Sequence, residues 1–234
     1  MYLQAHSRPD ITFAVNDLAR HVTNNNPVHH KAMKRVMAYC CQTPERGLYL
    51  KPTRTWDGSK QFLFRLRGRS DSDYATCKKT RRSTTGFVVY LEDAPIQVKT
   101  KTQQIVALSV CEAELIAMVQ CAQALMQARN IMESMGLQVE LPMTIECDNK
   151  GAVDLVNGFN VGNGTKHIQV RYLRMREWRE DGTFKVRWVS TEENEADVCT
   201  KNTPAKIFLK HIKNFVGADT YQEAEETEGM SDIE

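Results

Sequence analysis

The sequence predicts an α/β fold, in which three consecutive strands are followed by helices that alternate with two further strands. Two observations predict this order. Residues 61–100 contain three short segments rich in β-branched and aromatic side chains, separated by polar or turn-forming residues. Residues 107–135 repeat apolar side chains at spacings of three and four, which is typical of a helix packed on a core. Residues 1–52 are predicted to form a small helical appendage ahead of the sheet.

Length and composition indicate a globular protein with one main domain. The 234 residues can bury a sizeable core, and 41% hydrophobic with 26% charged residues is ordinary for a soluble domain. No apolar run approaches the roughly 20 residues that span a bilayer, and the first residues lack the apolar core of a signal peptide. The seven cysteines are scattered without a CxxC pair, which favours reduced thiols over a zinc or disulfide framework.

The formal net charge of +2 conceals an asymmetry along the chain. Residues 217–234 contain seven acids and no Lys or Arg, so the other residues carry about +9 together. A basic body favours a protein that binds a polyanion, and a merely solvated surface remains the alternative. Because residues 218–234 are acidic and lack apolar periodicity, we predict that this tail is disordered.

The appendage is predicted to hold two helices and a short extended piece. Pro9 can begin the first helix, and the Asn-Asn-Asn-Pro run at 24–27 separates it from a second helix with a basic face. Residues 47–50 look extended, and residues 53–60 form a turn-rich linker. Such a set cannot make a large core alone. We therefore interpret residues 1–52 as a truncated remnant of, or a connector to, something larger.

The first strand is predicted at residues 61–66, where Phe62, Phe64 and Leu66 alternate on one face of a pleat. It should run out into the Ser-Asp-Ser-Asp run at 70–73, which an apolar core would not accept unpaired. A carboxylate delivered there by a core strand either caps the next turn or binds a metal.

Two more strands should complete an antiparallel meander. A basic loop at residues 77–82 leads to a β-branched and aromatic segment at 84–91, which reads as a buried strand. Residues 92–95 turn the chain into a third strand at 96–100.

The long helix at residues 107–135 carries one unexpected charge. Glu114 lies in a stripe that is otherwise apolar, whereas Glu112 falls on another face that we expect water to reach. A carboxylate in an apolar stripe must protonate, pair or bind a cation. Gly136 is placed to end this helix.

The fourth strand, at residues 142–147, also terminates in an acid, Asp148. Asn149 and a short helix through Val156 follow, and the Asn- and Gly-rich loop at 157–164 is predicted to be mobile.

The remaining elements are a helix at residues 166–180, a strand at 183–189, and a helix that opens at 191–195 and bears Asp197. Pro204 begins a last amphipathic helix.

Four acids therefore mark two strand ends and two helices: Asp71, Glu114, Asp148 and Asp197. Around them the sequence resembles the ribonuclease H domain of copia-class retrotransposon reverse transcriptases. The matching segments, in chain order, are SDSDYA (70–75), RSTTGF (82–87), VALS (106–109), EAEL (112–115), CDN (147–149), TKHI (165–168), NEAD (194–197) and TK (200–201). The resemblance covers residues 60–216. Residues 1–50 resemble the segment that follows the polymerase palm in these elements, through SRPDI at 7–11.

The resemblance implies a fold and a chemistry. The fold is ribonuclease H-like: a five-stranded mixed sheet, with the meander plus two parallel strands, for which we set the domain at residues 61–217. The chemistry is metal-dependent hydrolysis of the RNA strand of RNA/DNA hybrids, with two Mg²⁺ ions about 4 Å apart and Mn²⁺ able to substitute. The implied catalytic and metal ligands are Asp71, Glu114, Asp148 and Asp197. The candidate nucleic-acid contacts are Lys78, Lys79, Arg81, Arg82, Asn149, Lys166, His167, Arg171 and Arg174.

Several alternatives stay open at this point. Asp73 could replace Asp71 as the first ligand, since the two share a strand face. Asp148 or Asp197 alone could be a helix cap. The rival function is a catalytically inactive hybrid-binding or structural module of a reverse transcriptase or degenerate retroelement copy, and an integrase or resolvase is a weaker one. The resemblance also implies that the partner is the remainder of a reverse transcriptase polyprotein, in a cytoplasmic retroelement particle or in the nucleus, without membrane attachment.

Overall fold

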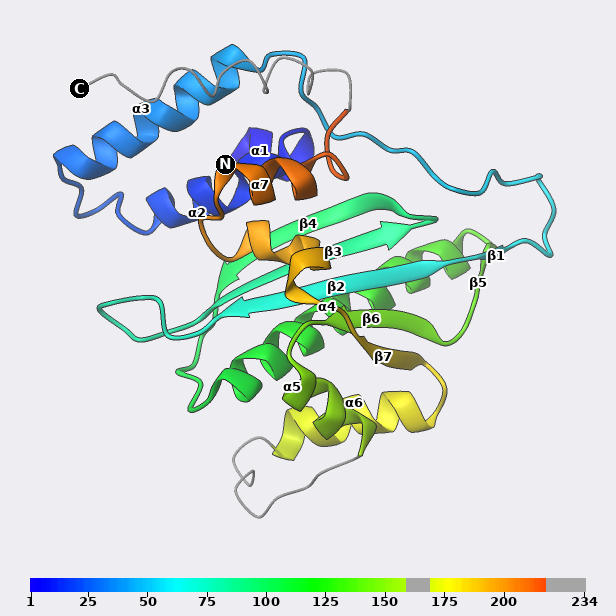
Figure 1. The fold of residues 1–234 in the computed structure, drawn as a ribbon. Helices are drawn as coiled ribbons and strands as arrows, with labels where there is room; N and C mark the ends of the chain where they lie inside the picture. Colours follow the sequence, from blue (N-terminus) through cyan, green and yellow to red (C-terminus); the bar gives the residue numbers. More distant parts are fainter. Residues whose placement is uncertain (159–168, 218–234) are drawn as a thin grey trace.

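The computed structural model describes residues 1–158 and 169–217, and a five-stranded sheet forms its centre (Figure 1). The strands are β2 (Leu66–Asp73), β3 (Thr84–Leu91), β4 (Ala94–Thr102), β6 (Met143–Cys147) and β7 (Phe184–Trp188). Their spatial order is β4-β3-β2-β6-β7. Strands β2, β3 and β4 pair antiparallel, whereas β2–β6 and β6–β7 pair parallel. The predicted α/β fold, with a meander and two parallel strands, is confirmed. It is the ribonuclease H-like fold.

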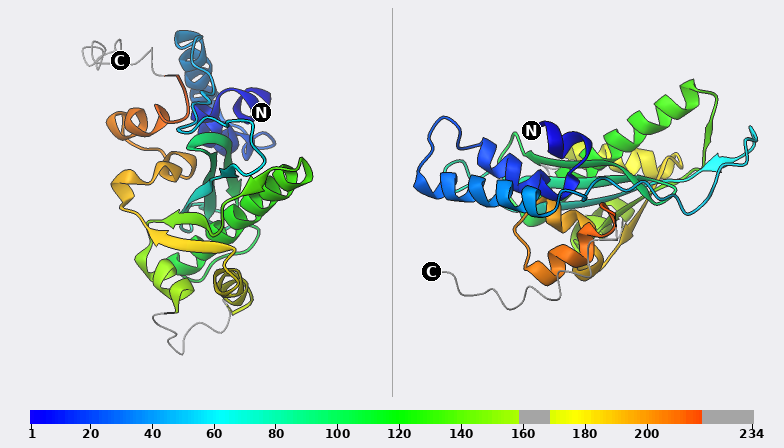
Figure 2. Two further views of the ribbon diagram at one scale, coloured as in Figure 1. Left: turned by 90° about the vertical axis from the view of Figure 1, so that its right-hand side faces the viewer. Right: turned by 90° about the horizontal axis from the view of Figure 1, so that it is seen from above.

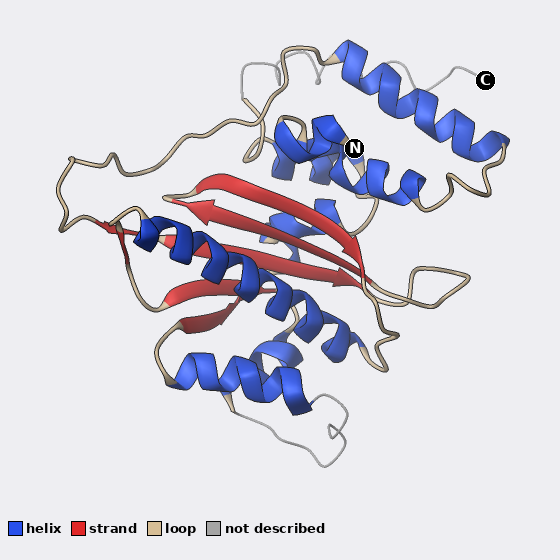
Figure 3. Cartoon of the chain, turned by 180° about the vertical axis from the view of Figure 1, so that it is seen from behind, coloured by secondary structure: helices blue, strands red, loops and turns tan. Residues whose placement is uncertain are grey.

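Helices cover both faces of this sheet. The long α4 (Val110–Ser134) crosses one face, whereas η4 (Glu195–Cys199) and α7 (Ala205–Ile212) lie on the other, as the edge-on view of Figure 2 and the rear view of Figure 3 show. Helices α5 (Lys150–Asn157) and α6 (Gln169–Glu180) pack beside β6 and β7. The sheet is therefore the middle of three layers, which lets β3 be buried on both sides.

The alternation of side chains along β3 builds two separate apolar clusters. Phe87 and Val89 belong to the larger cluster, which includes the inner face of α4. Val88 and Tyr90 belong to the smaller one, formed with η4, α7 and the residues that follow. Because successive side chains on a strand point to opposite faces, the β-branched and aromatic segment at β3 contributes side chains to the apolar clusters on both faces of the sheet.

The first strand lies further along the chain than predicted. The expectation of a strand over residues 61–66 that ends before Asp71 is wrong. Instead, β1 (Leu63–Phe64) pairs with β5 (Gln138–Val139) in a small second sheet, and β2 runs from Leu66 through Asp73. Each residue of β2 has a partner in β3. Pairing with a neighbouring strand therefore overrides the polar composition of this segment.

Two further expectations are corrected. Glu112 does not face water: it is 4% exposed, because Ser109 caps α4 and the Glu112 carboxylate turns back to accept the Leu108 N–H at 2.7 Å. The predicted helix that bears Asp197 is a pair of short 3₁₀ turns, η3 (Thr191–Glu193) and η4. Asn194 adopts an extended conformation between them, which breaks the helical path.

The amino-terminal residues form four short elements: α1 (Tyr2–His6), η1 (Pro9–Ile11), α2 (Thr12–Ala19) and α3 (Pro27–Gln42). The two predicted helices correspond to η1 with α2 and to α3, and α1 has no counterpart in the sequence prediction. Helix α2 lies against β4. The expected extended piece forms a bridge between Leu48 and Val216, and the Tyr49 N–H donates to the Phe215 carbonyl at 3.0 Å. The appendage is therefore joined to the end of the sheet domain.

All seven cysteines carry free thiols, as the sequence predicts. Within residues 1–158 and 169–217, no helix combines the length and the apolar character that crossing a membrane requires. The predicted acidic tail (218–234), most of the predicted mobile loop, and the candidates Lys166 and His167 lie outside the described residues.

Candidate metal centre

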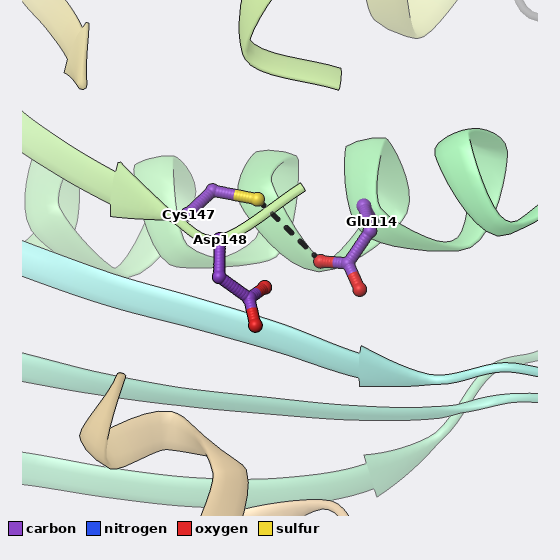
Figure 4. Close-up of side chains that lie close together, drawn as sticks. All are labelled: Glu114, Cys147 and Asp148. Carbon is purple, nitrogen blue, oxygen red and sulfur yellow. Dashed lines mark hydrogen bonds between the residues drawn. The ribbon is translucent and has the colours of Figure 1, made fainter. Parts of the chain in front are cut away.

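Two parallel neighbours deliver two acids to the same edge of the sheet. Asp71 lies near the carboxyl end of β2, and Asp148 follows the last residue of β6. Asp197 comes from η4 on the outer face, and its carboxylate oxygen lies within 4.8 Å of those of Asp71 and Asp148. Glu114 approaches from α4, where it groups with Asp148 and the Cys147 thiol over the same span (Figure 4). Asp148 is thus shared by both groups.

Local contacts hold η4 against β2 and β3. Gly86 pairs with Asp71 across the meander, and a Cβ at Gly86 would lie 2.6 Å from Thr200 Cγ2. Only a residue without a side chain admits η4 this closely. The Asn194 side-chain amide donates to the Ser70 carbonyl at 3.1 Å, which fixes the start of η4 beside the residue that precedes Asp71.

Glu114 is held by its neighbours rather than by solvent. It is 3% exposed, and its Oε1 accepts hydrogen bonds from the Ser72 N–H at 3.1 Å and the Ser72 hydroxyl at 2.9 Å. The Cys147 thiol donates to Oε2 at 3.5 Å, the contact drawn in Figure 4. Burial, followed by the charges of Asp71 and Asp148, raises the pKa of Glu114.

Burial, together with repulsion between the acids, changes their ionisation. Burial, followed by the charge of Asp197, raises the pKa of Asp71 to about 7, against the opposing effects of Lys201 and of the Thr200 hydroxyl that donates to Asp71. Burial also raises the pKa of Asp197. Such a cluster ionises fully only when positive charge lies beside it.

The cluster fits a hard divalent cation. The ligand atoms of Asp71, Asp148 and Asp197 are carboxylate oxygens, which Mg²⁺ and Mn²⁺ prefer. The Oδ1 atom of Asp197 is buried and has no hydrogen-bond partner. A buried acceptor without a partner is uncommon in folded proteins, and a cation would satisfy it.

No family model matches the chain. The chain is 33% identical over 93% of its length to the retrovirus-related Pol polyprotein from transposon TNT 1-94 of Nicotiana tabacum. It is also 33% identical, over 84% of its length, to the corresponding polyprotein from transposon RE2 of Arabidopsis thaliana. The chain belongs to the copia-type retrotransposon Pol polyproteins. It spans 16% and 13% of the length of these two curated relatives.

Among solved structures, this Pol region is similar to LC11-RNase H1, crystallised in complex with an RNA/DNA hybrid. The two chains are 13% identical, and the superposition covers 58% of this chain and 94% of that one with a TM-score of 0.45.

The alternatives left open by the sequence can be compared with this geometry. Asp73 is half-buried, pairs with Thr84 at the end of β2, and is outside both groups of clustered acids in the described part of the Pol region. The cap of α5 is Asn149, whose Oδ1 accepts the Ala152 N–H at 2.9 Å, so Asp148 does not serve as that cap. Asn194 caps η4, which leaves Asp197 without a capping role.

Lys201 is the residue of this centre that sequence reasoning missed. Its Nζ lies 3.0 Å from Asp197 Oδ2 and 3.9 Å from Asp71 Oδ2. Lys201 belongs to the TK segment at residues 200–201, for which the sequence predicts no role. The available signal was its position four residues after Asp197, a spacing at which opposite charges meet on a helical surface.

The candidate nucleic-acid contacts within the described residues are in three places. Lys78, Lys79, Arg81 and Arg82 are exposed on the β2–β3 loop, at the same edge of the sheet as Asp71. Arg171 and Arg174 lie on α6, where Arg174 pairs with Glu177 at 3.0 Å and stacks over the Trp178 ring. Asn149 uses its side-chain oxygen as a helix cap. Among the candidate contacts within residues 1–158 and 169–217, the β2–β3 loop is the group of exposed basic side chains at the carboxylate edge.

Proposed function

We propose that this Pol region is a ribonuclease H, which hydrolyses the RNA strand of RNA/DNA hybrids with two Mg²⁺ ions held by Asp71, Glu114, Asp148 and Asp197. One observation carries the proposal: four carboxylates that are far apart in the sequence lie in two groups that share Asp148, and the Oδ1 of Asp197 is buried there without a hydrogen-bond partner. A structural cluster of acids would cost stability without such ligands, because burial disfavours uncompensated charge.

The chain's own residues would act by holding and orienting. Asp71, Asp148 and Asp197 would share oxygens around a cation, and Glu114 would add a carboxylate on the Asp148 side. Thr191 donates to Asp148 Oδ2 at 2.8 Å, which orients that carboxylate. Bound divalent ions supply Lewis acidity for the attack of water on phosphorus and for the departure of the 3′-oxygen.

The exposed basic loop at residues 77–82 supports a nucleic-acid substrate. The loop lies at the same edge of the sheet as the clustered acids. Its positive side chains would contact the phosphate groups of a nucleic acid bound at the centre. Selection of RNA would rest on contacts to 2′-hydroxyl groups in a shallow minor groove. We propose that the other basic candidates, on α6 and at residues 166–167, also contact the nucleic acid.

We propose that this nuclease acts within a larger protein. The chain would work as the ribonuclease H part of a longer polyprotein, with residues 1–52 as the connection to the polymerase and residues 61–217 as the nuclease domain. The expected setting is a cytoplasmic retroelement particle, with the nucleus as a second compartment.

A labelled RNA/DNA hybrid with Mg²⁺ tests the proposal. The native chain should cut the RNA strand and leave 5′-phosphate ends. Asp148→Asn removes one ligand charge and should lower the rate about a hundredfold or more. Asp73→Asn is the matched control, because Asp73 lies two residues from Asp71 but outside the cluster, and it should keep most of the rate.

Two outcomes would contradict the proposal. Equal cutting by the Asp148→Asn variant would show that the activity belongs elsewhere. Hybrid binding without cutting by the native chain would instead support the catalytically inactive module.

A further inference from the structure

A cationic side chain already lies inside the candidate metal centre. The Lys201 ammonium lies 3.0 Å from Asp197 Oδ2 and 3.9 Å from Asp71 Oδ2, so one charge faces two of the clustered acids. Within residues 1–158 and 169–217, the ion pairs of Asp71 and Asp197 are both made with Lys201. The carboxylates of the cluster therefore have a counter-ion that belongs to the chain itself.

The backbone of Lys201 is anchored, whereas its side chain can leave. The Lys201 N–H donates to the Asp197 carbonyl at 3.2 Å, and the preceding residue, Thr200, is buried with its hydroxyl on Asp71. The side chain of Lys201 remains 37% exposed, while those of Asp71 and Asp197 are almost fully buried. A flexible four-carbon stem can swing from such a rim into water at little cost.

Lys201 contacts only one of the two carboxylate oxygens of Asp197. Its ammonium contacts Oδ2, whereas Oδ1 is the buried oxygen without a partner. The Lys201 side chain carries a positive charge at neutral pH, as lysine ordinarily does. A divalent cation bound by Asp71 and Asp197 would meet this ammonium at close range, where like charges repel.

We propose that Lys201 is an exchangeable counter-ion: its ammonium neutralises Asp71 and Asp197 until a divalent cation binds them, and is then displaced toward solvent. Lys201 thereby sets the metal concentration at which the centre fills. The inference rests on the proposed function only in treating the cluster as a cation site. It assigns to a residue of this chain a control over metal occupancy that does not depend on the substrate.

Metal binding to Lys201→Met measures this competition directly. Methionine keeps the length of the stem and removes the charge. We expect the variant to bind Mn²⁺ about fivefold more tightly than the native chain in calorimetric titrations, which is the effect of removing roughly one partly exposed ion pair. Lys201→Arg, which retains the charge, should bind like the native chain. Lys210→Met removes a lysine that pairs with Glu193 at 2.7 Å outside the cluster, and should leave the affinity unchanged.

Thermal unfolding supplies a second readout that needs no activity. In EDTA, the Lys201→Met variant should unfold at a lower temperature than the native chain, because the acids then repel without a counter-ion. Saturating Mg²⁺ should close that difference. In the native chain, labelling by an amine-reactive reagent should increase at Lys201 when Mg²⁺ is added, relative to Lys210.

The failure of this inference is distinguishable from that of the proposed function. If Mn²⁺ binds the native chain, and Asp148→Asn abolishes the binding, but Lys201→Met changes neither the affinity nor the melting in EDTA, then Lys201 is a static surface pair and the inference is overturned. If the native chain binds no Mn²⁺, both fail together.

Discussion

His211 shows how a single buried residue can make stability depend on pH. Its side chain is 1% exposed, and its Nε2 has no hydrogen-bond partner. Burial lowers the pKa of His211; Glu195 and Glu193 oppose this shift, while Lys210 and Arg69 add to it. The folded protein therefore holds the imidazole neutral over a pH range in which the unfolded chain has begun to protonate it.

The sign of the resulting effect follows from linkage. A histidine with a lowered folded-state pKa contributes its full stability above the unfolded value of about 6.5, and this contribution is lost as the pH falls below it. Between about pH 7.5 and about pH 5.5, urea denaturation should show a larger loss of stability in the native chain than in His211→Gln. Parallel pH profiles for the two proteins would contradict this prediction.

At the scale of elements, packing of η4 on the meander places Asp197 beside Asp71. Gly86 makes this packing possible, since an added Cβ would approach Thr200 Cγ2 to 2.6 Å and Cys199 Cβ to 2.7 Å. Both neighbours belong to a segment whose backbone is held by hydrogen bonds on either side. Neither can move without shifting the 3₁₀ turn.

Gly86→Ala should therefore lower the free energy of unfolding by about 2 kcal/mol, the usual cost of overpacking a filled interior. Displacement of η4 should also weaken Mn²⁺ binding by moving Asp197. Gly47→Ala is a suitable control, because nothing lies within 4 Å of its added Cβ and its φ is not in the left-handed region. Chemical denaturation and metal titration of both variants give the comparison, and equal behaviour would contradict this view of η4.

The elements themselves were largely predictable, and the exceptions share a cause. Periodicity located α4, and β-branched and aromatic composition located β3. Strand β2 was placed too early because its residues 70–73 are polar, and its conformation depends on pairing with β3. Glu112 was assigned to a wet surface because helical spacing does not show that a side chain turns back to the backbone N–H of Leu108, which precedes the helix.

At the scale of the whole molecule, the amino-terminal appendage is joined to the carboxyl end of the described chain. Leu48 bridges to Val216, and the amino-terminal elements hold their own buried ion pair. Arg8 Nη2 lies 2.7 Å from Asp10 Oδ2, and Tyr39 donates to the same oxygen at 2.8 Å. Because both charges are buried, loss of one partner would leave the other uncompensated.

Arg8→Met should accordingly destabilise the protein by about 3 kcal/mol. Since the appendage packs on β4 and pairs near the carboxyl end of the described chain, we expect one cooperative transition that shifts as a unit. Arg20→Met, at a surface pair with Asp17, is the control and should change stability by about 1 kcal/mol or less. Two separate transitions, followed by far-ultraviolet circular dichroism and tryptophan fluorescence, would show that the appendage unfolds independently.

By itself, the sequence determined the α/β class, the order of the meander and later strands, and which acids to examine, since periodicity and residue type report which side of an element is apolar. The tertiary structure alone decided which of these groups meet. It brought Lys201 onto Asp197 and Asp71, opened the space at Gly86, and left Asp73 outside the cluster. The physical reason is that a local pattern specifies the direction of a side chain, whereas distance and burial depend on elements packed from elsewhere in the chain.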